Sequence, residues 1–281
     1  MDDKFFLAEP DDLEIPNVGS WAKQKYKIVY EYNELFSVGM KKHWNQRVYI
    51  DLYSGSGKAK IEKTNQVLYS SPLLALKVPI LYDQYVFCDK NPKNIISLEK
   101  RVKSEFPNVN ADYVVGDCNE NINKIINPLP IPSYDNKVLS FCFIDPFALI
   151  VKFNTIKKLS ERFVDFLVLL AFGMDGKRNI KYYLKDNNYR IDEFLGSNEW
   201  RKRWSNAEKN GVNLVKFLAD EFTNKMVSLN YKQDAINNFI SIRSEEKNLP
   251  LYYLAFYSRN SRGYDFWKKV KKRNEEPGLF E

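Results

Sequence analysis

The stretch from Val48 to Gly57 reads Val-Tyr-Ile-Asp-Leu-Tyr-Ser-Gly-Ser-Gly and joins an apolar run to two closely spaced glycines. Its β-branched and aromatic residues favour a buried strand. Gly55 and Gly57 permit a tight turn and a close approach of the backbone to a ligand. Because a Gly-x-Gly pair also occurs in ordinary turns, the ends of the other strands must show whether this turn serves a ligand.

Further apolar runs of strand length follow, with helical segments between them. Strands are predicted at residues 84–88, 113–116, 139–144 and 164–172. Strands that alternate with helices indicate a parallel sheet with helices on both faces. The last two strands, at 239–242 and 251–257, follow each other without a crossover helix, which is typical of a hairpin. The sequence therefore predicts an α/β, Rossmann-like fold with a seven-stranded, mostly parallel sheet whose last strand is antiparallel and lies beside the fifth.

Composition divides the chain into four segments. Residues 1–46 form an N-terminal extension and a covering helix, and 47–172 form the Rossmann-like core that would bind the cofactor. Residues 173–235 form a helical insertion that is rich in charged and aromatic residues. Residues 236–281 supply the last two strands, which complete the sheet, and a charged tail.

The charge and the reactive residues exclude several classes of protein. The chain has 43 basic and 36 acidic residues, and its net charge of +7 is compatible with a nucleic-acid partner. A single histidine, His43, excludes His-rich metal sites and disfavours a Ser-His-Asp hydrolase. Three cysteines without a Cys-x-x-Cys pair, and no signal peptide, suggest a reduced, cytoplasmic setting. No apolar run approaches the ~20 residues of a membrane span.

Four successive strands each end in an aspartate: Asp51, Asp89, Asp117 and Asp145. Aspartate is uncommon in strands, and the carboxyl ends of parallel strands meet at the edge of the sheet where ligands bind. Any one of the four could simply cap a helix. Four in equivalent places indicate a ligand site instead.

S-adenosylmethionine fits these acids best. A dinucleotide site would have a third glycine in its loop and an acid ~20 residues later, whereas Asp89 lies further along the chain. Asp51, Tyr53 and the glycine loop would receive the methionyl end. Asp89 would accept both ribose hydroxyls, and Asp117 with Cys118 beside it would bind the adenine amine. Asp145 would lie nearest the sulfonium.

The tripeptide Asp145-Pro146-Phe147 resembles the (Asp/Asn)-Pro-Pro-(Tyr/Phe) motif of enzymes that methylate exocyclic amines. In those enzymes the acid and a backbone carbonyl polarise the amine, and the aromatic ring stacks on an extruded base. The second proline is missing here, and an Asp-Pro turn after a strand is also common for structural reasons alone. The three residues are therefore predicted as catalytic, with a plain turn as the alternative.

Basic residues in the insertion are candidates for phosphate contacts: Lys177, Arg178, Arg201 and Arg203. Trp200 and Trp204 flank the last two and could act as stacking platforms for bases. The alternative is an ordinary solvated helix face.

Five short motifs occur in a characteristic order: Trp21 to Lys25, Tyr49 to Gly57, Ser71 to Leu73, Phe143 to Phe147 and Leu251 to Arg259. Together they resemble the three-Cys-motif partner proteins, TcmP, over most of the chain. That resemblance implies the fold of class I methyltransferases and a genetic or physical partner, a radical-SAM-like protein that carries three cysteines. It implies no substrate.

The chain departs from this family at two places. The family's Phe-Ala-Gly-Pro-Gly loop is Tyr-Ser-Gly-Ser-Gly here, and its Asp-Pro-Phe-Gly ends in Ala148. Because the replacements are small, the loop stays compatible with a bound cofactor.

Three functions are compatible with these patterns. The first is an S-adenosylmethionine-dependent methyltransferase that acts on a nucleic-acid amine together with the three-Cys partner. The second is a non-catalytic, cofactor-binding or scaffolding subunit whose insertion docks the partner. A metal-dependent nuclease is the third, because acids at strand ends could hold Mg²⁺.

Overall fold

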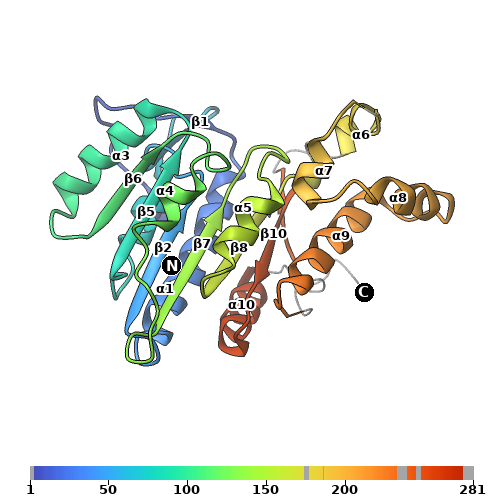
Figure 1. The fold of residues 1–281 in the computed structure, drawn as a ribbon. Coiled ribbons are helices and arrows are strands. Elements are labelled where there is room, and N and C mark those ends of the chain that lie inside the picture. The colour runs from blue at the N-terminus through green and yellow to red at the C-terminus, as the bar shows by residue number, and fades with distance from the viewer. Residues whose placement is uncertain (1–2, 174–176, 186, 233–238, 245–247, 275–281) are drawn as a thin grey trace.

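The computed structural model describes residues 3–173, 177–185, 187–232, 239–244 and 248–274. A central sheet lies between two layers of helices, and the insertion extends from one end of it (Figure 1).

Seven strands form the central sheet in the order β6-β5-β2-β7-β8-β10-β9. Their bounds are β2 Gln46–Asp51, β5 Gln84–Asp89, β6 Ala111–Val115, β7 Val138–Ile144, β8 Val164–Leu170, β9 Ile240–Arg243 and β10 Pro250–Tyr257. Strand β10 pairs antiparallel with both β8 and β9, and the other neighbours pair parallel. The predicted Rossmann-like fold is therefore confirmed, including the antiparallel last strand beside the fifth.

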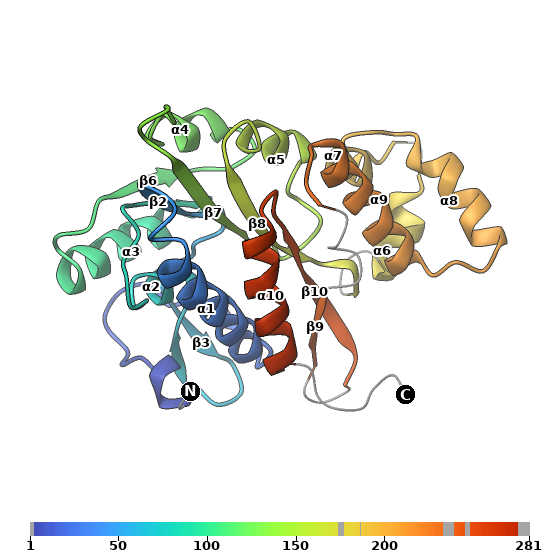
Figure 2. The same ribbon diagram turned by 90° about the horizontal axis from the view of Figure 1, so that it is seen from below.

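Helices cover both faces of this sheet. Helices α1 (Ala22–Gly39), α2 (Ser71–Ala75) and α10 (Ser261–Asn274) lie on one face, and α4 (Ile122–Ile126) and α5 (Phe153–Leu159) lie on the other (Figure 2). Helix α3 (Pro92–Glu105) packs against β5 and β6. Its start follows from its sequence, because the Asn91 side chain accepts a hydrogen bond from the Lys93 amide and Pro92 occupies the first turn.

Aromatic side chains hold the α1 face together. The buried ring of Tyr32 on α1 lies 4.9 Å from Phe141 on β7 and 4.7 Å from Phe256 on β10, between ring centroids. Phe256 in turn stacks on Trp267 of α10 at 5.7 Å. These rings join the first helix, two strands and the last helix into one core.

In the part that the structure describes, the expected charged tail is a helix. Residues Ser261–Asn274 form α10, which packs against α1. Tyr264, Trp267 and Val270 recur at helical spacing and are buried, whereas lysines and arginines occupy much of the rest of the helix. The run of basic residues concealed this amphipathic pattern.

A second, small sheet was not predicted. It consists of β1 (Asn17–Val18), β3 (Lys58–Ile61) and β4 (Val67–Tyr69), in the order β1-β3-β4. Asn65 adopts a left-handed conformation, with φ 58°, in the turn between β3 and β4. Only short apolar runs mark these strands, and the pairing with β1 is distant in sequence.

The described residues of the insertion form four helices: α6 Lys177–Tyr183, α7 Arg190–Leu195, α8 Trp200–Lys209 and α9 Leu214–Ser228. Phe194 of α7 stacks on Phe222 of α9 at 4.9 Å between centroids, and Phe222 also contacts Tyr257 of β10. The insertion is thus packed onto the sheet through α9. Among the described residues, no helix is both long and apolar enough to cross a membrane.

We expect Trp267→Ala to destabilise the protein by about 3–5 kcal/mol, because it empties a fully buried site shared by α1, β10 and α10. Urea denaturation would measure the change, with the exposed neighbour Lys268→Ala as the control. Equal small effects of both changes would show that α10 is not part of the core. If Trp267→Ala does not fold, Trp267→Phe should still give an intermediate loss.

Candidate functional site

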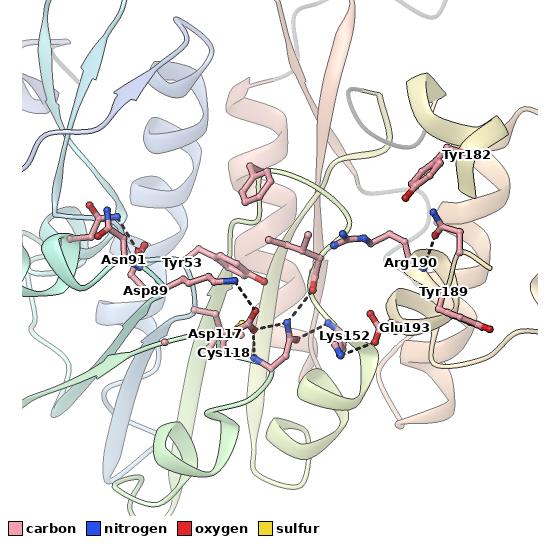
Figure 3. A pocket seen from close by; sticks show the side chains of 18 of the residues that line it. Tyr53, Asp89, Asn91, Asp117, Cys118, Lys152, Tyr182, Tyr189, Arg190 and Glu193 are labelled. Carbon is pink, nitrogen blue, oxygen red and sulfur yellow. Dashed lines mark hydrogen bonds and ion pairs between the residues drawn. The ribbon is translucent and has the colours of Figure 1, made fainter. Parts of the chain in front are cut away.

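A cavity of about 930 Å³ lies at the carboxyl ends of β2, β5 and β6. One wall comes from the strand ends, including Tyr53, Asp89 and Asp117. The opposite wall comes from the insertion, including Tyr182 and Arg190 (Figure 3). Its volume is near the upper end of the ~300–1,000 Å³ range of small-molecule pockets.

The strand register places Asp51, Asp89 and Asp117 at successively greater heights toward the carboxyl edge of the sheet. Asp51 pairs with Phe87 on β5, so Asp89 lies two residues further toward the carboxyl edge. Asp89 pairs with Val115 on β6, so Asp117 lies two residues further again. At ~3.3 Å per residue, each step is about 7 Å. Asp89 and Asp117 therefore reach the cavity, whereas Asp51 does not line it.

Asp89 ties the glycine loop to the second strand. Its Oδ2 accepts a hydrogen bond from the Gly55 amide at 2.9 Å, and its Oδ1 accepts from the Asn91 amide and the Asn94 side chain. A carboxylate has about four acceptor sites. Asp89 thus retains acceptor capacity while it lines the cavity.

Asn119 holds the Asp117 side chain in place. Its Oδ1 accepts from both the amide and the side-chain nitrogen of Asn119 at 2.9 and 2.8 Å. Asn119 also bonds to the Ile150 carbonyl, the Lys152 amide and the Thr155 hydroxyl. The loop after β6 is thereby joined to the loop after β7. Oδ2 of Asp117 has only a weak ion pair, 4.0 Å from Lys90.

Tyr53 and Cys118 form a buried floor in the cavity. Burial raises the pKa of the Cys118 thiol to about 11 and holds the pKa of Tyr53 well above its usual range. Both groups are therefore neutral near pH 7. The Tyr53 hydroxyl is buried, and no hydrogen-bond partner for it is found among the described residues.

The two glycines have different roles. Gly55 has φ 61°, and a Cβ there would meet open space. Gly57 has φ 89°, and a Cβ there would lie 2.9 Å from Leu73 and Leu98. Gly55 thus has open space beside its Cα, although it does not line the cavity, whereas Gly57 permits close packing of the loop on α2 and α3.

Asp51 is completely buried below the cavity. Its carboxylate accepts from the Tyr49 hydroxyl at 3.1 Å, from the Tyr53 amide at 3.2 Å and from the Ser71 side chain. Burial, with a smaller contribution from the charge of Asp145, raises the pKa of Asp51 to about 7 against the opposing effect of these hydrogen bonds. In this structure Asp51 supports the glycine loop from below through the Tyr53 amide, and its contact with the methionyl end stays a prediction.

Asp145 forms an ion pair with Lys25 of α1 at 2.5 Å, and both side chains are nearly buried. Burial favours the neutral amine, but the Asp145 carboxylate outweighs it and raises the pKa of Lys25 above its usual range. The sequence marks Lys25 only as part of a short motif, because the two partners of this ion pair are 120 positions apart.

Of the three predicted catalytic residues, only Phe147 lines the cavity, and its side chain is 75% exposed. Asp145 lies outside the cavity wall, and Pro146 is buried. Neither Asp145 nor Pro146 lines the cavity, and a catalytic role for these two residues stays a prediction. The ion pair to Lys25 fixes the turn that presents Phe147.

The insertion supplies groups that the sequence did not identify. Arg190 extends from α7 across the cavity toward the strand ends (Figure 3). Lys152, at the start of α5, forms an ion pair with Glu193 at 2.7 Å, which joins the two walls and raises the pKa of Lys152. Segments 38 or more positions apart meet here, and nothing local in the sequence marks the contact.

Two of the four basic residues predicted to bind nucleic acid form ion pairs within the insertion. Arg201 pairs with Asp192 of α7, and Arg203 pairs with Glu221 of α9 at 2.6 Å. Lys177 and Arg178 begin α6, but their side chains lie outside the described part of the structure.

The flanking tryptophans are not stacking platforms. Trp200 and Trp204 are 0% and 5% exposed, and the Trp200 indole donates to Asp192. The prediction of a base-stacking surface at these rings is wrong, because both fill the core of the insertion.

The aspartates at the strand ends do not form a metal site among the described residues. No group of three or more His, Cys, Asp or Glu side chains that could hold a metal is found within the described ranges. The nuclease alternative therefore has no support from the geometry.

The strand order and the antiparallel β10 define the fold of class I methyltransferases. Solved structures to which this chain is similar include a protein from Legionella pneumophila, with TM-score 0.47 and 10% identity over 87% of this chain and 91% of that one. The O-methyltransferase TomG from Streptomyces achromogenes, solved in complex with SAM, gives 0.43 and 12% over 91% and 93%. An O-methyltransferase from Bacillus cereus, solved in complex with SAH, gives 0.43 and 12% over 83% and 80%.

No protein-family model matches the chain, and no curated protein matches it significantly. Membership of the TcmP family therefore stays a prediction.

We expect Lys25→Met and Asp145→Asn each to lower the free energy of unfolding by about 3–5 kcal/mol, because each change breaks a nearly buried ion pair. The double variant should lose less than the sum of the two. A double-mutant cycle by urea denaturation measures this coupling. The exposed pair Glu99–Lys103 on α3 is the control, with an expected coupling below about 1 kcal/mol. Additive effects at Lys25 and Asp145 would contradict the ion pair.

The raised pKa of Asp51 predicts a pH-dependent stability. Between the unfolded value of 3.8 and the folded value of about 7, the folded protein binds the proton more tightly than the unfolded chain. The stability from this group is therefore fully present below 3.8 and is lost as pH rises to about 7, by up to about 1.4 kcal/mol per pH unit.

Asp51→Asn removes this titration, so its unfolding free energy relative to wild type should rise from about pH 4 to about pH 8. Denaturation curves across that range would measure it, with the exposed Asp135→Asn as the control. A constant difference between Asp51→Asn and wild type would mean that Asp51 is ionised throughout.

Proposed function

We propose that this protein is an S-adenosylmethionine-dependent methyltransferase that acts on a nucleic-acid base, at an exocyclic amine. The observation that carries the proposal is the cavity at the carboxyl ends of the strands, with Asp89 and Asp117 in its wall at successive steps. This is the place where parallel sheets bind ligands.

The residues present fit the cofactor. Asp89 has unused acceptor capacity for the ribose hydroxyls, and Oδ2 of Asp117 has only a distant lysine as a partner. The neutral Cys118 thiol and the Tyr53 ring offer an apolar surface beside these acids. Leu52 and Tyr53, at the start of the glycine loop, line the cavity beside the expected place of the methionyl part. When bound, S-adenosylmethionine supplies an electrophilic methyl group.

The chain's own residues would orient the acceptor. Phe147 presents its exposed ring to the cavity from the turn that Lys25 and Asp145 fix. A planar base can stack on such a ring. The half-exposed Lys152–Glu193 ion pair links the insertion wall to the start of α5. The choice of an amine rests on the Asp145-Pro146-Phe147 motif.

A second function is favoured by one observation. Because Asp145 is held by Lys25 outside the cavity, the chain could bind the cofactor without transferring the methyl group. It would then serve a partner such as a three-Cys, radical-SAM-like protein. Incubation with S-adenosylmethionine labelled in its methyl group, and with total RNA or DNA, separates the two functions: label in the nucleic acid supports the enzyme, and cofactor binding without transfer supports the subunit.

Isothermal titration calorimetry with S-adenosylmethionine and S-adenosylhomocysteine tests the cofactor. We expect binding to the wild type, weakened by about 1–3 kcal/mol in Asp89→Ala, because the ribose loses its charged acceptor. The exposed Asp135→Ala, outside the cavity, should bind as the wild type does. No binding to the wild type at millimolar ligand would overturn the proposed function.

A further inference from the structure

The cavity has two chemically different ends. The strand ends offer hydrogen-bond acceptors, with Asp89 and Asp117 in the wall. The insertion and the loop after β7 offer exposed aromatic rings, with Phe147 75% and Tyr182 59% exposed. Large exposed rings on a monomer are typical of a binding surface when they gather at one site. The first end suits the cofactor, which leaves the second for the methyl acceptor.

One cation at the acceptor end is free to bind a ligand. Of the cations that line the cavity, Lys152 pairs with Glu193 and Lys90 lies 4.0 Å from Asp117. No described residue pairs with the Arg190 guanidinium, which extends into the space between the walls (Figure 3). A free guanidinium in a cavity is a bidentate partner for a phosphate.

Arg190 is also held in position. The buried Asn188 accepts a hydrogen bond from the Arg190 amide at 3.0 Å, and its own carbonyl accepts one from Arg201 at 2.5 Å. Arg201 pairs with Asp192 on the same helix as Arg190. The insertion's internal ion pairs therefore fix the backbone of the turn from which the Arg190 side chain projects.

We propose that Arg190 binds a backbone phosphate of an unpaired nucleotide whose base enters between Phe147 and Tyr182. This inference rests on the proposed function and names the form of its substrate: single-stranded or locally opened nucleic acid. A base within a duplex cannot reach a cavity between two walls without leaving its stack. Lys185, whose ammonium lies 5.6 Å from the Tyr182 ring, extends the positive charge along the path of the strand.

The test compares Arg190→Gln, Arg190→Lys and a matched control, Lys202→Gln, which removes one exposed charge from α8 outside the cavity. Fluorescence anisotropy measures binding of a short single-stranded RNA oligonucleotide, of its DNA equivalent and of the duplex. Calorimetry with S-adenosylhomocysteine accompanies each variant.

We expect Arg190→Gln to weaken single-strand binding about tenfold or more and to lower the salt dependence by about one phosphate contact. Arg190→Lys should recover part of the affinity, Lys202→Gln should change it by less than about twofold, and duplex should bind more weakly than single strand. Affinity for S-adenosylhomocysteine should be the same in all four proteins.

The outcomes separate this inference from the proposed function. If the wild type does not bind S-adenosylhomocysteine, the proposed function fails. If it does, but Arg190→Gln and Lys202→Gln bind the oligonucleotide equally, or no oligonucleotide binds, the phosphate role of Arg190 is overturned. The acceptor would then be a protein or a small molecule.

Discussion

Parallel pairing of β2 with both β5 and β7 is the constraint on which the site depends. The register places Asp51 opposite Phe87 and Phe143, so that Asp89 and Asp145 both extend two residues beyond it. Asp51 is consequently left in the protein interior, where its charge is costly and burial raises its pKa to about 7. The neighbouring strands carry their acids up to the edge, one into the cavity and one to Lys25.

Much of the fold could be predicted from the sequence, because each strand of the main sheet is a short apolar run with turn residues after it. The seven predicted strands correspond to β2 and β5–β10. The cavity-lining residues Asp89 and Asp117 could be predicted too, because they follow strands directly. What the sequence could not supply is register, since a shift of two residues leaves the same pattern but moves a side chain by about 7 Å.

The positions and ion-pair partners of the charged side chains were the hardest features to predict from the sequence. Arg201 and Arg203 have the composition of a phosphate-binding surface, yet they hold helices α7, α8 and α9 together. Arg190 looked like any other exposed arginine and lies in the cavity. The pairing of Lys25 with Asp145 and of Lys152 with Glu193 joins segments far apart in the chain. Such partners depend on tertiary structure, and periodicity carries no information about them.

The buried thiols have a consequence for how the protein tolerates oxidation. All three cysteines are buried, and burial raises the pKa of each, so that hardly any thiolate exists at neutral pH. Peroxide and alkylating reagents attack the thiolate, and these sulfurs are poor targets for them. The cavity can therefore present sulfur to a ligand as a soft, apolar surface, with none of the redox sensitivity that an exposed cysteine would bring.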